Sequence, residues 1–230
     1  MVQSSPFTVE IFDFLRDLKA NNNKVWFEAN KDRYHQYGRD EMVKALIELQ
    51  ADLSTFAPQI EIIPKTVGGS LHRIYRDLRF SKDKTPYKTH LLAHLRHRQR
   101  EKSRGLGFYL HIEPEGSIVA GGIWHLEPKD ALLVRKKIVD HPDRWEAATR
   151  SPGFLRLYGS VNGEQLQRVP KEFDDDHKFA ADLKRKAFGG MAYLTDDQIL
   201  GPDCIPLVVD YFKTATPIMH FMADVFDLPW

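Results

Sequence analysis

Apolar residues recur every three or four positions near the start of the chain, a spacing typical of one face of a helix. We predict that this helix begins at Ser5, because serine is a good N-cap and Pro6 fits the first helical turn. It should end at Asn21–Asn23, since asparagine competes for backbone hydrogen bonds. The apolar stripe consists of Phe7, Ile11, Phe14, Leu15 and Leu18.

The same spacing predicts further helices along the chain. Gly38 should end the second helix, and Thr216-Pro217 should separate the last two, because Pro favours the first turn of a new helix. The predicted helices cover residues 24–37, 41–56, 128–139, 177–186, 205–213 and 217–226, with a short helix that starts at Pro142.

Strict alternation of apolar and polar residues marks the middle of the chain as strands. In residues 89–97, apolar Leu91, Ala93 and Leu95 alternate with His90, His94 and Arg96. Residues 108–113 and 117–124 form a predicted hairpin across Pro114-Glu115-Gly116. Weaker patterns predict strands over 61–67 and 165–173. Gly121-Gly122 indicates that a neighbouring element or a ligand approaches closely.

Helices at both ends and strands between them predict an α+β fold. We expect a central, mostly antiparallel sheet flanked by N-terminal and C-terminal helices. The chain contains neither a repeat nor a long linker, so residues 1–230 are expected to form a single domain.

Composition narrows the class of protein. Of 230 residues, 42% are hydrophobic and 28% are charged, as in ordinary globular proteins. The single cysteine, Cys204, excludes an internal disulfide and favours a cytoplasmic location. No stretch approaches the ~20 apolar residues of a membrane span, and the first residues lack a signal-peptide pattern.

Positive charge is concentrated in one segment of the chain. The net charge is +1, but residues 72–102 contain ten Lys and Arg residues against three acidic residues. The rest of the chain therefore carries a net negative charge. A local positive field in a nearly neutral protein suits a defined anionic ligand better than a general polyanion.

Arginines three residues apart, interleaved with apolar residues, form the candidate site in this segment. A guanidinium matches a carboxylate or phosphate with two hydrogen bonds, so several together predict a pocket for a small anionic, phosphorylated ligand. Asp77 would orient an arginine or act as a base, and Tyr87 would supply a hydroxyl. The residues expected to line the pocket are Arg73, Arg76, Arg79, Lys84, Lys88 and Trp124.

Two other functions fit the same segment. The basic side of residues 89–100, with Tyr75, Phe80 and Tyr87 for stacking, would suit a nucleic-acid-binding module. Alternatively, the arginines form a purely structural network of ion pairs in an interaction protein. The sequence names no cofactor and leaves open whether the protein is an enzyme of phosphoryl or acyl chemistry.

Three histidines follow the arginines, and we expect no metal site among them. In a strand, His90 and His94 would lie ~13 Å apart, and His97 would point to the opposite face. The chain also lacks an HExxH or cysteine-rich pattern.

Residues 73–87 read RIYRDLRFSKDKTPY and match the pattern RxxRDxRFxx[DN]KxxY at every specified position. With this segment the chain resembles the DUF2461 family of uncharacterised bacterial and fungal proteins. The segments NKVWF at 23–27, GFYL at 107–110 and GGI at 121–123 resemble the family too. The resemblance implies that the chain is one family unit. It carries over no catalytic role, because the function of that family is unknown.

Overall fold

The computed structural model describes residues 4–230. Its first part is helical, and α1 ends at Ala20, as the asparagine run predicted. The predicted start at Ser5 was wrong, because the Ser5 hydroxyl donates to the Ile199 carbonyl (2.7 Å) and Thr8 is the N-cap. The elements are α1 (Val9–Ala20), α2 (Lys24–Ala29), α3 (Lys31–Arg33), the π-helix η1 (Tyr34–Asp40) and α4 (Glu41–Phe56).

Gly38 does not end a helix, contrary to the prediction. The chain passes through Gly38 in the π-helical geometry of η1 and continues directly into α4, which matches its predicted range. A Cβ atom at Gly38 would lie 3.0 Å from the Tyr34 ring. The glycine therefore permits close packing inside the helical segment.

Residues 4–230 form a five-stranded sheet in the order β1-β2-β3-β4-β5, with every neighbouring pair antiparallel. This arrangement confirms the predicted α+β class. The strands are β1 (Ile60–Glu61), β2 (Leu91–His97), β3 (Gly107–Ile112), β4 (Ser117–Ile123) and β5 (Phe188–Leu194).

Two strand predictions need correction, and one strand was missed. The strand expected over 61–67 is only β1, because the chain turns back and the Ser70 N–H bonds the Ile63 carbonyl at 2.8 Å. Residues 165–173 make only an isolated bridge, between Gln165 and Arg185. The sheet is instead completed by β5, which was not predicted.

The connection from β4 to β5 carries α5 (Pro128–Asp140), α6 (Pro142–Thr149), α7 (Pro152–Tyr158) and α8 (Ala180–Leu183). The helix predicted over 177–186 is thus much shorter. After β5 come α9 (Asp196–Leu200) and α10 (Cys204–Val225). Pro217 lies inside α10, so the predicted break was wrong. Phe212 and Phe221 on either side of it are buried, and this packing outweighs the missing hydrogen bond.

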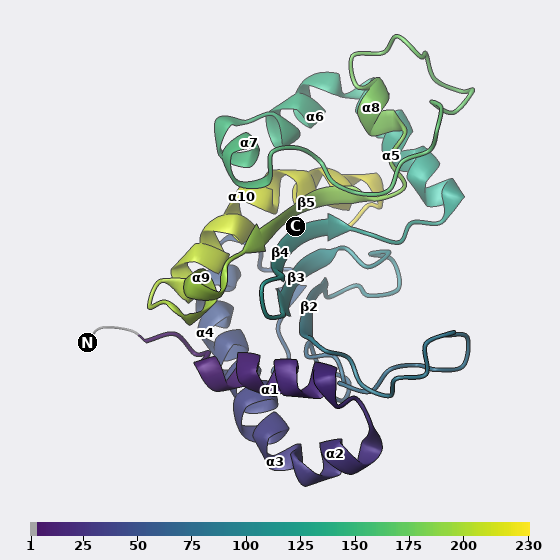
Figure 1. Cartoon of the computed structure of the whole chain (residues 1–230). Helices are drawn as coiled ribbons and strands as arrows, with labels where there is room; N and C mark the ends of the chain where they lie inside the picture. The colour runs from purple at the N-terminus through teal and green to yellow at the C-terminus, as the bar shows by residue number, and fades with distance from the viewer. Residues whose placement is uncertain (1–3) are drawn as a thin grey trace.

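One face of the sheet carries the core, and α4 and α10 lie behind it in Figure 1. Phe108 of β3 stacks on Phe212 of α10 with ring centroids 4.6 Å apart. The opposite face is mostly half-buried or exposed, and Tyr193 is 68% exposed. We call it the open face. Its side chains are Leu92, His94, Arg96, Tyr109, His111, Ile118, Ala120, Met191 and Tyr193.

Among residues 4–230, none of the helices combines the length and the apolar composition required to cross a lipid bilayer.

Candidate functional site

Residues 73–88 form an irregular hairpin, here called the arginine hairpin, which projects beside β2 (Figure 1). Its two arms are joined by backbone hydrogen bonds from Arg76 to Pro86 (2.9 Å) and from Lys88 to Ile74 (2.8 Å). Asn22, between α1 and α2, holds the base of the hairpin. Its amide donates to the Tyr87 carbonyl at 2.9 Å and accepts from the Tyr87 N–H at 3.1 Å.

The Arg76 side chain points into this hairpin and contacts its second arm. Its guanidinium pairs with Asp83 and bonds both the hydroxyl and the carbonyl of Thr85. The Thr85 N–H also donates to Asp83 at 2.9 Å. This N–H and the Arg76 guanidinium lower the pKa of Asp83 to about 2. Arg76 therefore fits the structural interpretation of the arginines as well as the ligand-binding one.

Several predicted ligand residues lie at the exposed tip of the hairpin. The Arg79 side chain is 78% exposed and pairs with Asp77 at 2.7 Å. The hydrogen bonds from Arg79 lower the pKa of Asp77, so this carboxylate stays ionised. Its oxygens already accept hydrogen bonds from Arg79. Lys84 donates to the Leu78 carbonyl at 3.0 Å. None of these side chains lines the groove described next.

A groove of about 430 Å³ separates the end of α1 from the base of the arginine hairpin. Of the predicted ligand residues, it brings together Arg76 and Lys88. Lys19, near the end of α1, was not predicted, because nothing in the local sequence shows that this end of α1 lies beside residues 73–88. The lining residues are Lys19, Asn22, Arg76, Asp83, Thr85, Tyr87, Lys88, Thr89 and His90.

The remaining predicted residues are placed differently. Tyr87 is 3% exposed and stacks on Phe27 with centroids 4.0 Å apart, so its ring belongs to the core. Arg73 is exposed and not among the groove-lining residues. Trp124 lines a separate hollow beside Gly163 and Lys186, near the other end of the sheet.

His94 lies in β2 and its side chain is on the open face, where it contacts Arg96 of the same strand and Tyr109 of β3. Arg96 donates to Nδ1 at 2.8 Å, so Nε2 carries the proton and faces the Gly105 carbonyl at 3.2 Å. The ring stacks on Tyr109 at 4.0 Å. Burial, followed by the charge of Arg96, lowers the pKa of His94 to about 3. His97 points into the core and contacts the Pro229 carbonyl at 2.8 Å.

We expect His94 to make the protein acid-sensitive. The unfolded chain takes up a proton near pH 6.5, whereas folded His94 does so only near pH 3. The free energy of unfolding should therefore fall as the pH drops below 6.5, by at most ~1.4 kcal/mol per pH unit from this group. The charged or titratable groups around it are Arg96, Arg100, His72 and Tyr109.

Urea unfolding of wild type and His94→Gln between pH 4.5 and 7.5 measures this contribution. The variant should show a shallower pH dependence, while His125→Gln, at an exposed position, should follow wild type. Parallel curves for wild type and His94→Gln would contradict the assignment.

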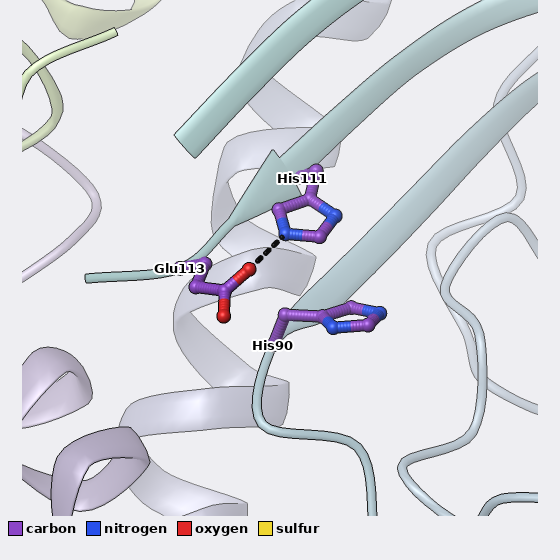
Figure 2. A group of neighbouring side chains, drawn as sticks. All are labelled: His90, His111 and Glu113. Atoms are coloured by element: carbon purple, nitrogen blue, oxygen red, sulfur yellow. Dashed lines mark hydrogen bonds and ion pairs between the residues drawn. The ribbon is translucent and has the colours of Figure 1, made fainter. Parts of the chain in front are cut away.

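Two histidines and a glutamate meet at one edge of the open face (Figure 2). Leu91 pairs with Ile112 in the β2–β3 register, which brings His90 opposite Glu113 and diagonal to His111. The His111 Nε2 atom lies 3.0 Å from a Glu113 carboxylate oxygen, and the two histidine rings stack at 4.2 Å. One potential ligand atom from each residue lies within 4.8 Å of the others. Residues of this kind can hold a metal ion.

The sequence interpretation missed this cluster because it compared only the histidines of one strand. The available signal was the His-x-Glu pair at 111–113, whose alternate positions at the end of β3 place both side chains on one face. Its meeting with His90 depends on the β2–β3 register, which the sequence pattern did not define.

The fold and groove thus define an α+β protein with an antiparallel sheet and a cationic groove at its edge. A family model described as conserved hypothetical protein (DUF2461) matches residues 10–221. The chain therefore belongs to the DUF2461 family, which confirms the resemblance seen in the sequence. No curated protein and no solved structure matches it.

Proposed function

We propose that the protein binds a small anionic, phosphorylated ligand in the groove at the base of the arginine hairpin. The observation that carries this proposal is the state of Lys88. Its side chain is half-buried, and burial followed by the charge of Arg73 lowers the pKa of its ammonium group. Among residues 4–230, no carboxylate lies within 4.0 Å of this ammonium.

A half-buried cation without a counter-ion costs free energy unless a ligand compensates it. The rest of the groove supports an anionic ligand. Lys19 adds a second cation, Asn22 and Thr89 add polar side chains, and Asp83 is already neutralised by Arg76. A bound phosphate would accept charge-assisted hydrogen bonds here.

The size of the groove favours a small ligand over a nucleic acid strand. A volume of about 430 Å³ lies within the range typical of small-molecule pockets. Of the aromatic residues considered for base stacking, Tyr87 is buried against Phe27. Phe80 is 94% exposed, but it lies at the tip of the hairpin.

Lys88→Met tests the proposal, because methionine keeps the aliphatic stem and removes the charge. We expect affinity for the ligand to fall by ~10–100-fold, since hydrogen bonds to charged groups contribute ~1.5–3 kcal/mol. Titration calorimetry would use inorganic phosphate, a sugar phosphate and a nucleoside monophosphate. Lys82→Met, on the exposed part of the same hairpin, should bind like wild type.

Stability without ligand separates this function from a structural network. If Lys88 serves a ligand, Lys88→Met should unfold at the same urea concentration as wild type or a higher one. A marked loss of stability would instead indicate a structural role. Binding of single-stranded DNA or RNA alone, falling steeply with salt, would favour the nucleic-acid alternative.

A further inference from the structure

We propose that His90, His111 and Glu113 bind one divalent transition-metal ion, such as Zn²⁺ or Fe²⁺, on the open face. This inference does not depend on the proposed anion binding. It follows from three ligand-type side chains brought together by two neighbouring strands (Figure 2).

The distances fit one ion. Zinc bonds to nitrogen and oxygen are ~2.0–2.2 Å long, so two ligand atoms on one ion lie at most ~4.4 Å apart. The three ligand atoms already lie within 4.8 Å of one another. Small side-chain rotations, moving each atom by less than ~1 Å, would bring them onto one ion.

The scaffold beneath these side chains is well held. The antiparallel register of β2 and β3 positions the three Cα atoms. The Ser117 hydroxyl bonds both the N–H (3.2 Å) and the carbonyl (3.0 Å) of Glu113, which secures the turn after β3. A site on a paired strand end is more precise than one on a free loop.

The side chains also retain capacity for a ligand. Within residues 4–230, neither ring nitrogen of His90 has a hydrogen-bond partner, although the residue is only partly exposed. Among the described residues, the Glu113 carboxylate bonds to His111 only and pairs with no lysine or arginine. His94 differs, because both of its nitrogens are already occupied by Arg96 and Gly105.

The ligand set defines the class of metal. Two imidazoles and one carboxylate suit zinc or ferrous iron, whereas Mg²⁺ and Ca²⁺ prefer oxygen ligands. Three protein ligands leave coordination positions for water or a substrate, as in catalytic rather than closed structural zinc sites.

The cluster lies beside two hollows in which a ligand could occupy the open coordination positions. His90 also lines the cationic groove, and Glu113 lines a neighbouring hollow of about 320 Å³ beside Arg16 and Lys19. A phosphorylated ligand in the groove could therefore reach the ion with an oxygen atom. A metal ion beside a phosphoryl group would act as a Lewis acid.

Metal binding itself is the test. Metal-free protein, prepared with a chelator, is titrated with Zn²⁺ and Co²⁺, with Fe²⁺ under anaerobic conditions, and with Mg²⁺. We expect one Zn²⁺ or Co²⁺ per chain, visible Co²⁺ absorption bands, and no binding of Mg²⁺. Three variants, His90→Ala, His111→Ala and Glu113→Gln, should each weaken Zn²⁺ binding more than the ~10–100-fold lost when a residue hydrogen-bonded to a metal ligand is removed.

The controls keep the result interpretable. His125→Ala removes an exposed histidine outside the cluster and should bind Zn²⁺ like wild type. Lys88→Met should lose phosphate binding but keep the metal, so failure of the two proposals can be told apart. Circular dichroism confirms that each variant is folded. Absence of Zn²⁺ and Co²⁺ binding by folded wild type, or wild-type Zn²⁺ affinity in two of the three variants, would overturn the site.

Discussion

Asp182→Ala should lower the free energy of unfolding by about 3–5 kcal/mol, the range typical for breaking a buried ion pair. Asp182 lies in α8, and its side chain is 2% exposed. One carboxylate oxygen accepts from Arg150 at 2.8 Å and from the Trp145 indole at 2.9 Å, and the other lies 3.3 Å from Arg185.

Alanine would leave these donors without their acceptor. The Arg185 side chain is 11% exposed and the Trp145 side chain is fully buried, so water cannot easily replace the carboxylate. Urea unfolding at pH 7 measures the loss.

Asp17→Ala is the matched control, because Asp17 pairs with Arg33 at 2.9 Å but is 53% exposed. An exposed pair contributes only ~0–1 kcal/mol. Similar losses in the two variants would show that burial does not set the strength of the Asp182 cluster.

Gly122→Ala is expected to destabilise the protein by about 3 kcal/mol or more, from backbone strain and overpacking together. Gly122 has a φ of +151°, and in β4 it pairs directly with Gly189 of β5. A Cβ atom would lie 2.4 Å from both the Gly189 Cα and the Phe188 carbonyl oxygen. Both are backbone atoms, so the sheet itself would have to separate.

Gly159→Ala is a control that measures the destabilisation caused by backbone strain without overpacking. Gly159 also has a positive φ, +70°, but a Cβ atom there would meet no atom within 4 Å. We expect it to cost only ~1–2 kcal/mol. Equal midpoints for the two variants in a urea melt would contradict the steric argument for Gly122.

Much of the fold could be predicted from the sequence because its periodicity is local. The α4 stripe and the β3–β4 hairpin carry their signals within a few turns or strand lengths. β5 was missed because its glycine pair, Gly189-Gly190, weakens any strand pattern. The pair is explained only by the structure, where Gly190 faces the Tyr158 ring at a distance that excludes a Cβ atom.

The candidate site was predictable only in part. The arginine motif correctly drew attention to residues 73–88, but three-residue spacing does not place side chains together on an irregular hairpin. Arg76 turns inward and Arg79 outward. Lys19 lines the groove because the end of α1 lies beside the hairpin, where Asn22 contacts Tyr87, a residue far away in sequence.

The long connection between β4 and β5 has a consequence for folding of the growing chain. β2, β3 and β4 are joined only by residues 98–106 and 113–116, so they can pair as soon as they are synthesised. β5 must wait for residues 124–187, and closing so long a loop costs entropy. During this interval β4 is an open edge, and open edges pair with other chains. We therefore expect aggregation on slow synthesis or slow refolding to begin at β4, before α10 has covered the core.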